Sequence, residues 1–184
     1  DHKQDYLIEI LAECKRAGNP DMVYKFSSTS KITFPGSGIA ALATSPNNME
    51  DFVTNLRFQT LGHDKVNQLR HVRFFGNIHG MVEHMRKHAS IIRPKFEAVE
   101  NILKKNLEGL GIGTWTCPLG GYFILFDSLP GCAKDIVARA KKAGVILTGA
   151  GATWPYSKDP NDSNIRIAPT YPALADLTTA MEIF

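Results

Sequence analysis

The chain has 184 residues, of which 43% are hydrophobic and 21% charged, an ordinary composition for a folded protein of one domain or two small ones. The formal net charge of +3 is too small and dispersed to indicate a nucleic-acid-binding surface, and no apolar run reaches the ~20 residues that span a bilayer. The three cysteines lack paired spacing, which favours a reduced, cytoplasmic location.

Both ends of the chain have the pattern of an interrupted helix. Asp1 leads into a helical pattern whose apolar positions begin at Tyr6. Phe184 ends another such pattern without a glycine, an asparagine or a basic last turn. The sequence is therefore expected to be a fragment of a longer protein.

The first 75 residues predict alternating helices and strands. Helical spacing over 6–14 ends at Gly18-Asn19-Pro20, and another helix is expected to start at Asn47 with acidic residues in its first turn. Residues 22–27 predict a short strand, and 38–44 a second one that is apolar enough to be fully buried. The polar loop between these strands is the kind of segment that binds ligands at the edge of an α/β sheet.

The rest of the chain changes character near residue 110. The pattern predicts a largely helical stretch over 64–110 with breaks near Gly76 and Pro94, and then a helix over 133–143 closed by Gly144. Pro172 is expected at the first position of a final helix. Four strands are predicted, at 114–117, 122–127, 145–147 and 165–168. The predicted fold class is α/β, with the remainder of a large α/β domain over 1–75, a helical connector over 76–110 and a small α+β domain over 111–184.

Lys31 lies in the loop between the first two strands. A lysine amine is the group that forms an imine with an aldehyde, but its ordinary pKa of about 10.4 keeps it protonated at neutral pH. An apolar setting would favour the neutral amine, and Phe26, Ile32 and Phe34 are the residues that could supply it.

Hydroxyl groups and glycines surround this lysine in the sequence. Ser28, Thr29 and Ser30 offer hydroxyls and backbone amides that suit a phosphate group, and Gly36 and Gly38 let the backbone approach a ligand. The spacing alone favours an exposed lysine in a serine- and threonine-rich turn.

Arg166 lies on the predicted strand over 165–168, with loops on either side. A guanidinium binds a carboxylate through two parallel hydrogen bonds, which fix the orientation of the ligand as well as its charge. The residues alone also fit an exposed strand arginine.

Five segments, in the same order, resemble those of the fold-type I pyridoxal phosphate (PLP)-dependent aminotransferases of class I/II. The resemblance covers nearly the whole chain and is narrower with a divergent aspartate aminotransferase subgroup. Each segment alone is weakly specific, and the combination is specific. The segments are Ser27–Gly38, Asn67–His71, Gly120–Phe123, Gly149–Pro155 and Asn164–Pro169.

The resemblance implies a C-terminal part of the large PLP-binding domain followed by the small α+β domain. It implies that Lys31 holds PLP as a Schiff base (aldimine), is displaced by the substrate, and then moves the proton between the substrate α-carbon and the cofactor. Ser28, with Ser30, would bind the cofactor phosphate, and Arg166 the substrate α-carboxylate. The implied enzyme is a homodimer that moves an amino group between an aspartate-like amino acid and a 2-oxo acid.

The sequence lacks one residue that the family uses to bind the cofactor phosphate. Many relatives have an arginine shortly after the Pro-Gly pair, where this chain has Ser37 and Gly38, so the countercharge must come from elsewhere. The resemblance also places the aspartate that pairs with the cofactor ring before Asp1. The isolated chain is therefore expected to bind PLP weakly or to be inactive.

Other functions stay open from the sequence. A PLP-dependent lyase or decarboxylase of the same fold fits the same lysine, as does the PLP-binding regulatory domain of a transcription factor. His84 and His88 are one helical turn apart, but no third ligand is evident, so no metal site is predicted. The basic stretch over 70–93 lacks interleaved aromatic residues beyond Phe74-Phe75, so neither nucleic acid nor membrane is an expected partner.

Overall fold

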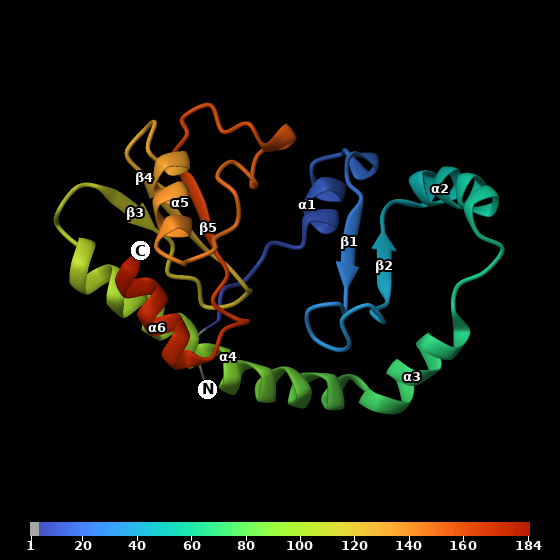
Figure 1. The fold of residues 1–184 in the computed structure, drawn as a ribbon. Coiled ribbons are helices and arrows are strands. Elements are labelled where there is room, and N and C mark those ends of the chain that lie inside the picture. Colours follow the sequence, from blue (N-terminus) through green and yellow to red (C-terminus); the bar gives the residue numbers. More distant parts are fainter. Residues whose placement is uncertain (1–3) are drawn as a thin grey trace. The chain divides into compact units, whose positions relative to one another are not determined.

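The computed structural model describes residues 4–184, which separate into two units (Figure 1). One unit is Tyr6–His88, and the other is Ala89–Phe184 together with the described residues before Tyr6. Within residues 4–184, no helix is both long and apolar enough to cross a membrane.

The Tyr6–His88 unit is built around a two-stranded antiparallel ribbon. Its strands pair in the register Phe26↔Leu42 and Ser28↔Ala40. The elements in chain order are α1 (Ile10–Arg16), a 3-10 turn (Pro20–Met22), β1 (Lys25–Ser28), β2 (Ala40–Ala43), α2 (Pro46–Gln59), α3 (Lys65–Phe75) and the first turns of α4 (Ile78–Leu107).

The expectation of a fully buried second strand is wrong for this chain. Three of the four residues of β2 are exposed, as are all four of β1. Among the described residues each of these strands pairs only with the other, so the apolar side chains of 40–43 have no covering layer.

The first two helices of this unit do not start where the sequence predicts. The first helix starts at Ile10 and not at Tyr6, which is 94% exposed and packs against nothing that would favour a helical turn. The helix expected at Asn47 begins at Pro46, because the Ser45 hydroxyl accepts the Asn48 N–H at 3.2 Å as its N-cap. Its first turn therefore contains no acidic residue.

The long helical stretch breaks once and not twice. Gly76 ends α3 with a φ of +68°, as predicted. Pro94 does not interrupt α4, which continues to Leu107. Proline lacks an N–H and so removes one helical hydrogen bond, but the following turns bury Phe96, Val99 and Leu103 against the sheet of the second unit. This packing keeps the helix continuous.

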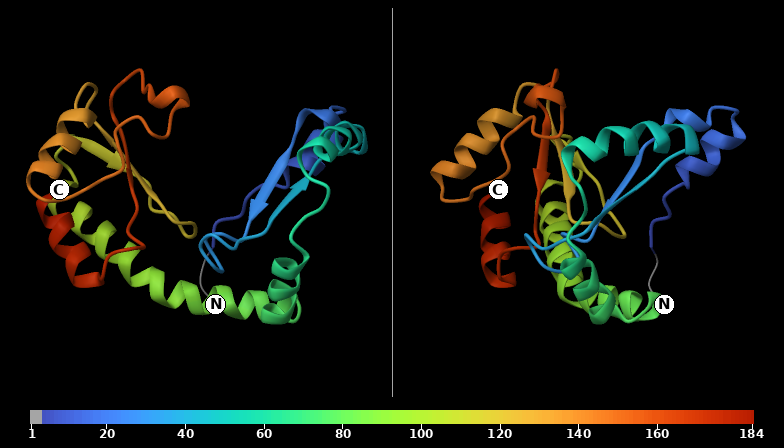
Figure 2. Two further views of the ribbon diagram at one scale, coloured as in Figure 1. Left: turned by 45° about the vertical axis from the view of Figure 1, so that its right-hand side comes forward. Right: turned by 90° about the vertical axis from the view of Figure 1, so that its right-hand side faces the viewer.

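The second unit is a three-stranded antiparallel sheet packed against helices (Figure 2). The strand order is β3-β4-β5. Its core combines side chains from α4, β4, β5, α5 and α6, with Leu103, Ile124 and Ile165 among the fully buried ones. The elements are β3 (Gly113–Trp115), β4 (Ile124–Ser128), α5 (Ala133–Lys142), a 3-10 turn (Pro155–Ser157), β5 (Asn164–Ile167) and α6 (Leu174–Ile183).

The alternation of side chains along β4 and β5 gives the sheet one apolar face and one polar face. Ile124 pairs with Ile167 and Phe126 with Ile165, and all four are buried in the core. The intervening residues therefore point to the other face, where Leu125 pairs with Arg166. The strand register itself thus keeps Arg166 out of the core.

Two local predictions in this unit are wrong. Residues 145–147 form no strand, because the Val145 N–H bonds the Ala140 carbonyl at 2.8 Å at the end of α5 and Ile146 is 83% exposed. Pro172 lies two residues before α6, whose N-cap is Ala173. The strands expected at 114–117, 122–127 and 165–168 are present with ends shifted by one or two residues.

Candidate functional site

Lys31 lies in a tight turn that follows β1. The Thr29 carbonyl accepts the N–H groups of Ile32 and Thr33, both at 2.9 Å, and this closes one turn of backbone around the lysine. The Thr29 N–H bonds the Ile39 carbonyl at 2.9 Å and joins the two ends of the loop. The Lys31 side chain is exposed in this unit.

Two serine hydroxyls lie together immediately before the lysine. The Oγ atoms of Ser28 and Ser30 are 3.1 Å apart, and the Ser30 N–H bonds the Ser28 hydroxyl at 3.2 Å. A Cβ added to Gly38 would lie 3.0 Å from the Ser30 backbone nitrogen, so a glycine lets the returning chain pass close to Ser30. Adjoining hydroxyls and a backbone N–H can bind a phosphate, so Ser28 and Ser30 suit a phosphorylated cofactor.

The apolar setting expected around Lys31 is not formed by its aromatic neighbours in this chain. Phe26 is 73% exposed. Phe34 turns away to α3, where its ring packs edge-on against Phe74 at a centroid distance of 5.6 Å. Phe34, which was expected to provide an apolar setting for Lys31, therefore packs against α3 instead.

Two residues of α3 hold the lysine loop. The Nε2 atom of His71 is 3.1 Å from the Thr29 hydroxyl and 3.0 Å from the Thr33 hydroxyl. The Asn67 side-chain amide donates to the carbonyls of Ser37 at 2.8 Å and Gly38 at 3.3 Å. The loop is therefore fixed at both of its ends to one face of one helix.

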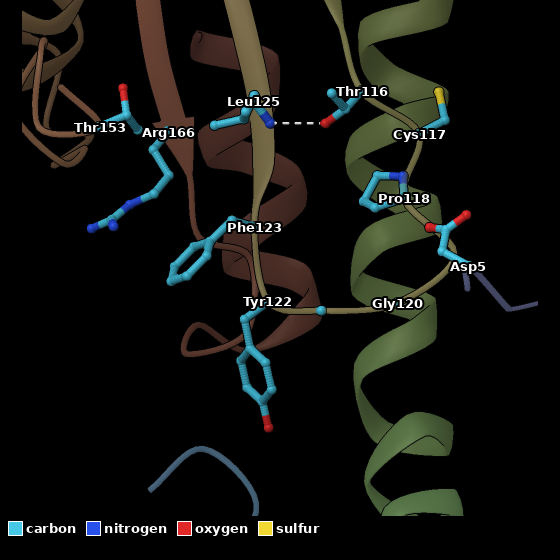
Figure 3. A pocket seen from close by; sticks show the side chains of 11 residues that line it. Asp5, Thr116, Cys117, Pro118, Gly120, Tyr122, Phe123, Leu125, Thr153 and Arg166 are labelled. Atoms are coloured by element: carbon cyan, nitrogen blue, oxygen red, sulfur yellow. Dashed lines mark hydrogen bonds between the residues drawn. The ribbon is translucent and has the colours of Figure 1, made fainter. Parts of the chain in front are cut away.

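Arg166 borders a pocket of about 650 Å³ on the open face of the sheet in the second unit (Figure 3). Its guanidinium carbon lies 4.5 Å from the centre of the Phe123 ring, and its buried Nε has no hydrogen-bond partner among the described residues. The interpretation as an exposed strand arginine is thus wrong. The pocket is lined by Asp5, Thr116, Cys117, Pro118, Gly120, Gly121, Tyr122, Phe123, Leu125, Thr153 and Arg166.

The other ionisable groups that line this pocket, Asp5, Cys117 and Tyr122, carry no positive charge. Burial raises the pKa of the Tyr122 phenol, and burial followed by the nearby Glu100 raises the pKa of the Cys117 thiol, so both groups are neutral at pH 7. One Asp5 oxygen accepts the Leu119 N–H at 2.7 Å. Arg166 is therefore the cationic side chain of the described pocket wall.

A chain of polar groups ties the loop after α5 to the strand of Arg166. The Thr153 hydroxyl donates to the Asn164 side-chain oxygen at 2.6 Å, and the Asn164 amide donates to Asp127 at 2.7 Å. Gly151 has a φ of +80°, and a Cβ there would lie 2.6 Å from the Ser157 carbonyl oxygen, so only a glycine fits. These contacts fix Thr153 at the pocket wall.

Asp159 organises the approach to β5. Its carboxylate accepts three backbone N–H groups, from Asn161 at 2.9 Å and from Ser163 and Asn164 at 2.8 Å each. These hydrogen bonds, that of Asn164 foremost, lower the pKa of the Asp159 carboxyl below its ordinary value. Because the pKa is lower in the folded chain, the resulting stabilisation is present above the unfolded-state pKa and is lost as the pH falls through the folded-state pKa.

Replacing Asp159 by asparagine should lower the melting temperature at pH 7 by ~2–4 °C, a shift typical of losing one charged backbone cap. The difference should shrink as the pH falls through the folded-state pKa of Asp159, because the wild-type carboxyl then becomes protonated as well. Thermal unfolding followed by circular dichroism between pH 2.5 and 8 measures this. Glu108→Gln removes the same charge at an exposed position and serves as control. An Asp159→Asn difference that is independent of pH would contradict this assignment.

The predicted site residues fall in two places. Ser28, Ser30 and Lys31 share one loop of the Tyr6–His88 unit, and Arg166 belongs to the other unit. The sequence reasoning gave no role to His71 or Phe123, although both stand inside segments that it singled out. The signal for His71 is its i, i+4 spacing from Asn67, which places two polar side chains on one face of a helix.

The histidine pair on α4 makes contacts inside its own unit. His84 Nε2 donates to the Ile32 carbonyl at 2.5 Å, and its ring lies 4.6 Å from that of His88 between centroids. Over the described residues there is no group of three or more histidine, cysteine, aspartate or glutamate side chains that could hold a metal ion.

Solved structures place this fold in a class. The chain matches the crystal structure of an aspartate transaminase from Corynebacterium glutamicum with a TM-score of 0.89 and 42% identity, over 96% of this chain and 42% of that one. It also matches an alpha-aminoadipate aminotransferase from Thermus thermophilus with a TM-score of 0.79 and 18% identity, over 98% of this chain and 45% of the other, which shows the fold alone. The fold is therefore that of part of an aminotransferase.

Sequence comparison narrows the class. The family model for aspartate amino-transferase matches residues 2–184. The aspartate aminotransferase of C. glutamicum is 42% identical over 176 residues, which are 96% of this chain and 41% of that protein. The chain belongs to the aspartate aminotransferase family, and it spans about two fifths of the length of this relative. The family and the fold expected from the sequence are confirmed.

Proposed function

We propose that the whole protein is a PLP-dependent aminotransferase that moves an amino group between an acidic amino acid such as aspartate and a 2-oxo acid. The observation that carries the proposal is the family match over residues 2–184, which includes both the Lys31 loop and the Arg166 strand. A relative of 42% identity is named as an aspartate aminotransferase, and the more distant structural neighbour contains a phosphopyridoxyl amino acid.

The donor set of the loop supports the cofactor. When bound, PLP supplies an aldehyde for an amine and a ring that withdraws electrons from the substrate α-carbon. The exposed Lys31 amine would attach the cofactor, and the adjoining hydroxyls of Ser28 and Ser30 would hold its phosphate. Once released by the substrate, the same amine would carry the proton at the substrate α-carbon.

Arg166 supports the substrate assignment. Its guanidinium carbon lies over the Phe123 ring, 4.5 Å from the ring centre, and its buried Nε–H lacks an acceptor among the described residues. A carboxylate that enters the pocket would supply that acceptor through two parallel hydrogen bonds. We assign the substrate α-carboxylate to this position.

The proposal is tested by product analysis with the whole protein, PLP, aspartate and 2-oxoglutarate. We expect glutamate and oxaloacetate to form in equal amounts, with no glutamate when PLP is omitted after dialysis against an amine that removes it. Release of carbon dioxide or ammonia without amino transfer would instead identify a decarboxylase or lyase and refute the proposal. The homodimer, the cytoplasmic location and the division at residues 75 and 110 stay predictions.

A further inference from the structure

His71 is the buried polar centre of the Tyr6–His88 unit. Its exposed fraction is 2%, and the rings of Phe34 and Phe75 lie beside it at centroid distances of 6.2 and 6.3 Å. Both nitrogens of its imidazole have partners. Nδ1 faces the Asn67 carbonyl at 2.9 Å, and Nε2 faces the two threonine hydroxyls.

The hydrogen-bond network defines the tautomer of this ring. A carbonyl can only accept, so the proton lies on Nδ1 and is donated to Asn67. In this tautomer Nε2 is an acceptor. The Thr33 hydroxyl donates its one proton to the Thr29 carbonyl, whereas the Thr29 hydroxyl accepts the Ile39 N–H and still has its own proton to donate to His71 Nε2. The hydrogen bond from Thr29 therefore ties the ring to the lysine loop, and the Thr33 oxygen lies 3.0 Å from the same nitrogen.

The two threonines that contact His71 flank Lys31 in the sequence. Thr29 and Thr33 are two residues before and two residues after Lys31, and the Thr33 hydroxyl also bonds the Thr29 carbonyl at 3.0 Å. His71 Nε2 thus contacts hydroxyls on both sides of the lysine while the lysine side chain stays exposed. One turn earlier on α3, Asn67 holds the far end of the loop through Ser37 and Gly38.

We propose that His71, with Asn67, is a positioning residue that fixes the backbone of the lysine turn and so sets where the Lys31 amine meets the substrate α-carbon. The inference rests on the proposed function of Lys31. A proton-transferring group must be held within a fraction of an ångström of its working position, and a misplacement of ~1 Å costs about 10²-fold in rate. A histidine that served only to fill the core would stabilise the unit without affecting the proton-transfer step.

The test uses the holoenzyme and compares His71→Phe, which keeps a ring but removes both nitrogens, with His71→Gln, whose amide oxygen can reach the Nε2 position. His79→Phe makes the same change at an exposed histidine of α4 and is the control. Three properties are measured: kcat and KM with aspartate, the primary isotope effect with α-deuterated aspartate, and hydrogen exchange of the amides of residues 29–39.

We expect His71→Phe to lower kcat by about 10–100-fold with KM for aspartate changed less than about threefold, because Arg166, to which the substrate carboxylate is assigned, is untouched while the proton carrier is misplaced. The isotope effect should rise, because α-proton transfer becomes slower than the other steps. The loop amides should exchange at least about tenfold faster. His71→Gln should recover part of each property, and the control should match wild type.

Two results would overturn the inference: His71→Phe with unchanged loop exchange and isotope effect, or rate losses that follow the amount of folded protein alone. If His71→Phe does not fold, Asn67→Leu replaces it, since it removes the amide that donates to the Ser37 and Gly38 carbonyls of the loop. A raised isotope effect in Asn67→Leu supports the inference, and an unchanged one opposes it. Borohydride reduction followed by mass spectrometry shows separately whether Lys31 carries the cofactor. A negative result there contradicts the proposed function and not the contact of His71 with the loop.

Discussion

Replacing Lys31 by alanine in the whole protein should lower kcat for amino transfer by at least about 10³-fold, because one amine is proposed both to attach the cofactor and to carry the α-proton. The visible absorbance band of the lysine-bound cofactor should disappear in the same variant. Lys31→Arg should be as inactive as Lys31→Ala, since a guanidinium stays protonated and cannot attach to the aldehyde. Steady-state assays and absorbance spectra at equal protein concentration measure both effects.

Lys25→Ala is the matched control for this prediction. Lys25 lies on β1 six residues before Lys31, and its amine pairs with Glu9 at 2.5 Å outside the lysine turn. Its removal should leave both the band and kcat within about twofold of wild type, because exposed ion pairs contribute little to stability. A Lys31→Ala enzyme that keeps more than a tenth of the wild-type rate, or that keeps the absorbance band, would refute the assignment of Lys31.

The parts of the fold that were predictable from sequence are those whose signals are local. The strand predicted at 122–127 corresponds to β4, because its apolar and aromatic residues stand next to one another in the sequence. The run at 145–147 has the same apolar character but no partner strand, and so stays irregular. Pro94 predicts a helix break from local sequence alone. The helix nevertheless continues, because the residues that follow the proline are buried on one helix face.

The candidate site was predictable only in part for the same reason. Lys31, Ser28 and Ser30 are adjacent, so a motif of a few residues can reveal them. His71 is 42 residues from Thr29 and 38 from Thr33, and nothing in the local sequence pairs them. The exposed strand β2 shows that a local sequence signal can also mispredict burial. Its apolar composition predicts a buried strand, but no other strand among the described residues except β1 pairs with it and three of its four residues are exposed.

Arg166→Lys should lower kcat/KM for aspartate by about 10²-fold while the absorbance of the bound cofactor stays as in wild type. Each hydrogen bond to a charged group contributes about 1.5–3 kcal/mol, and lysine replaces a two-pronged contact with a single point charge. Phe123→Leu should give a smaller loss, about 3–30-fold, because it removes only the ring on which the guanidinium rests at 4.5 Å. Full kinetic profiles with aspartate measure both variants.

The substrate itself provides the decisive control. A primary amine without any carboxylate offers Arg166 no partner of this kind, so wild type and Arg166→Lys should process it at rates within about threefold of each other. A loss of 10²-fold with the carboxylate-free amine as well would mean that Arg166 supports the fold of the sheet and not the substrate carboxylate. Arg166 points to the pocket face and away from the core side chains of β4 and β5, so its replacement should leave the melting temperature within about 2 °C of wild type. Selectivity for the carboxylate together with unchanged stability is the combination that only a substrate-binding arginine produces.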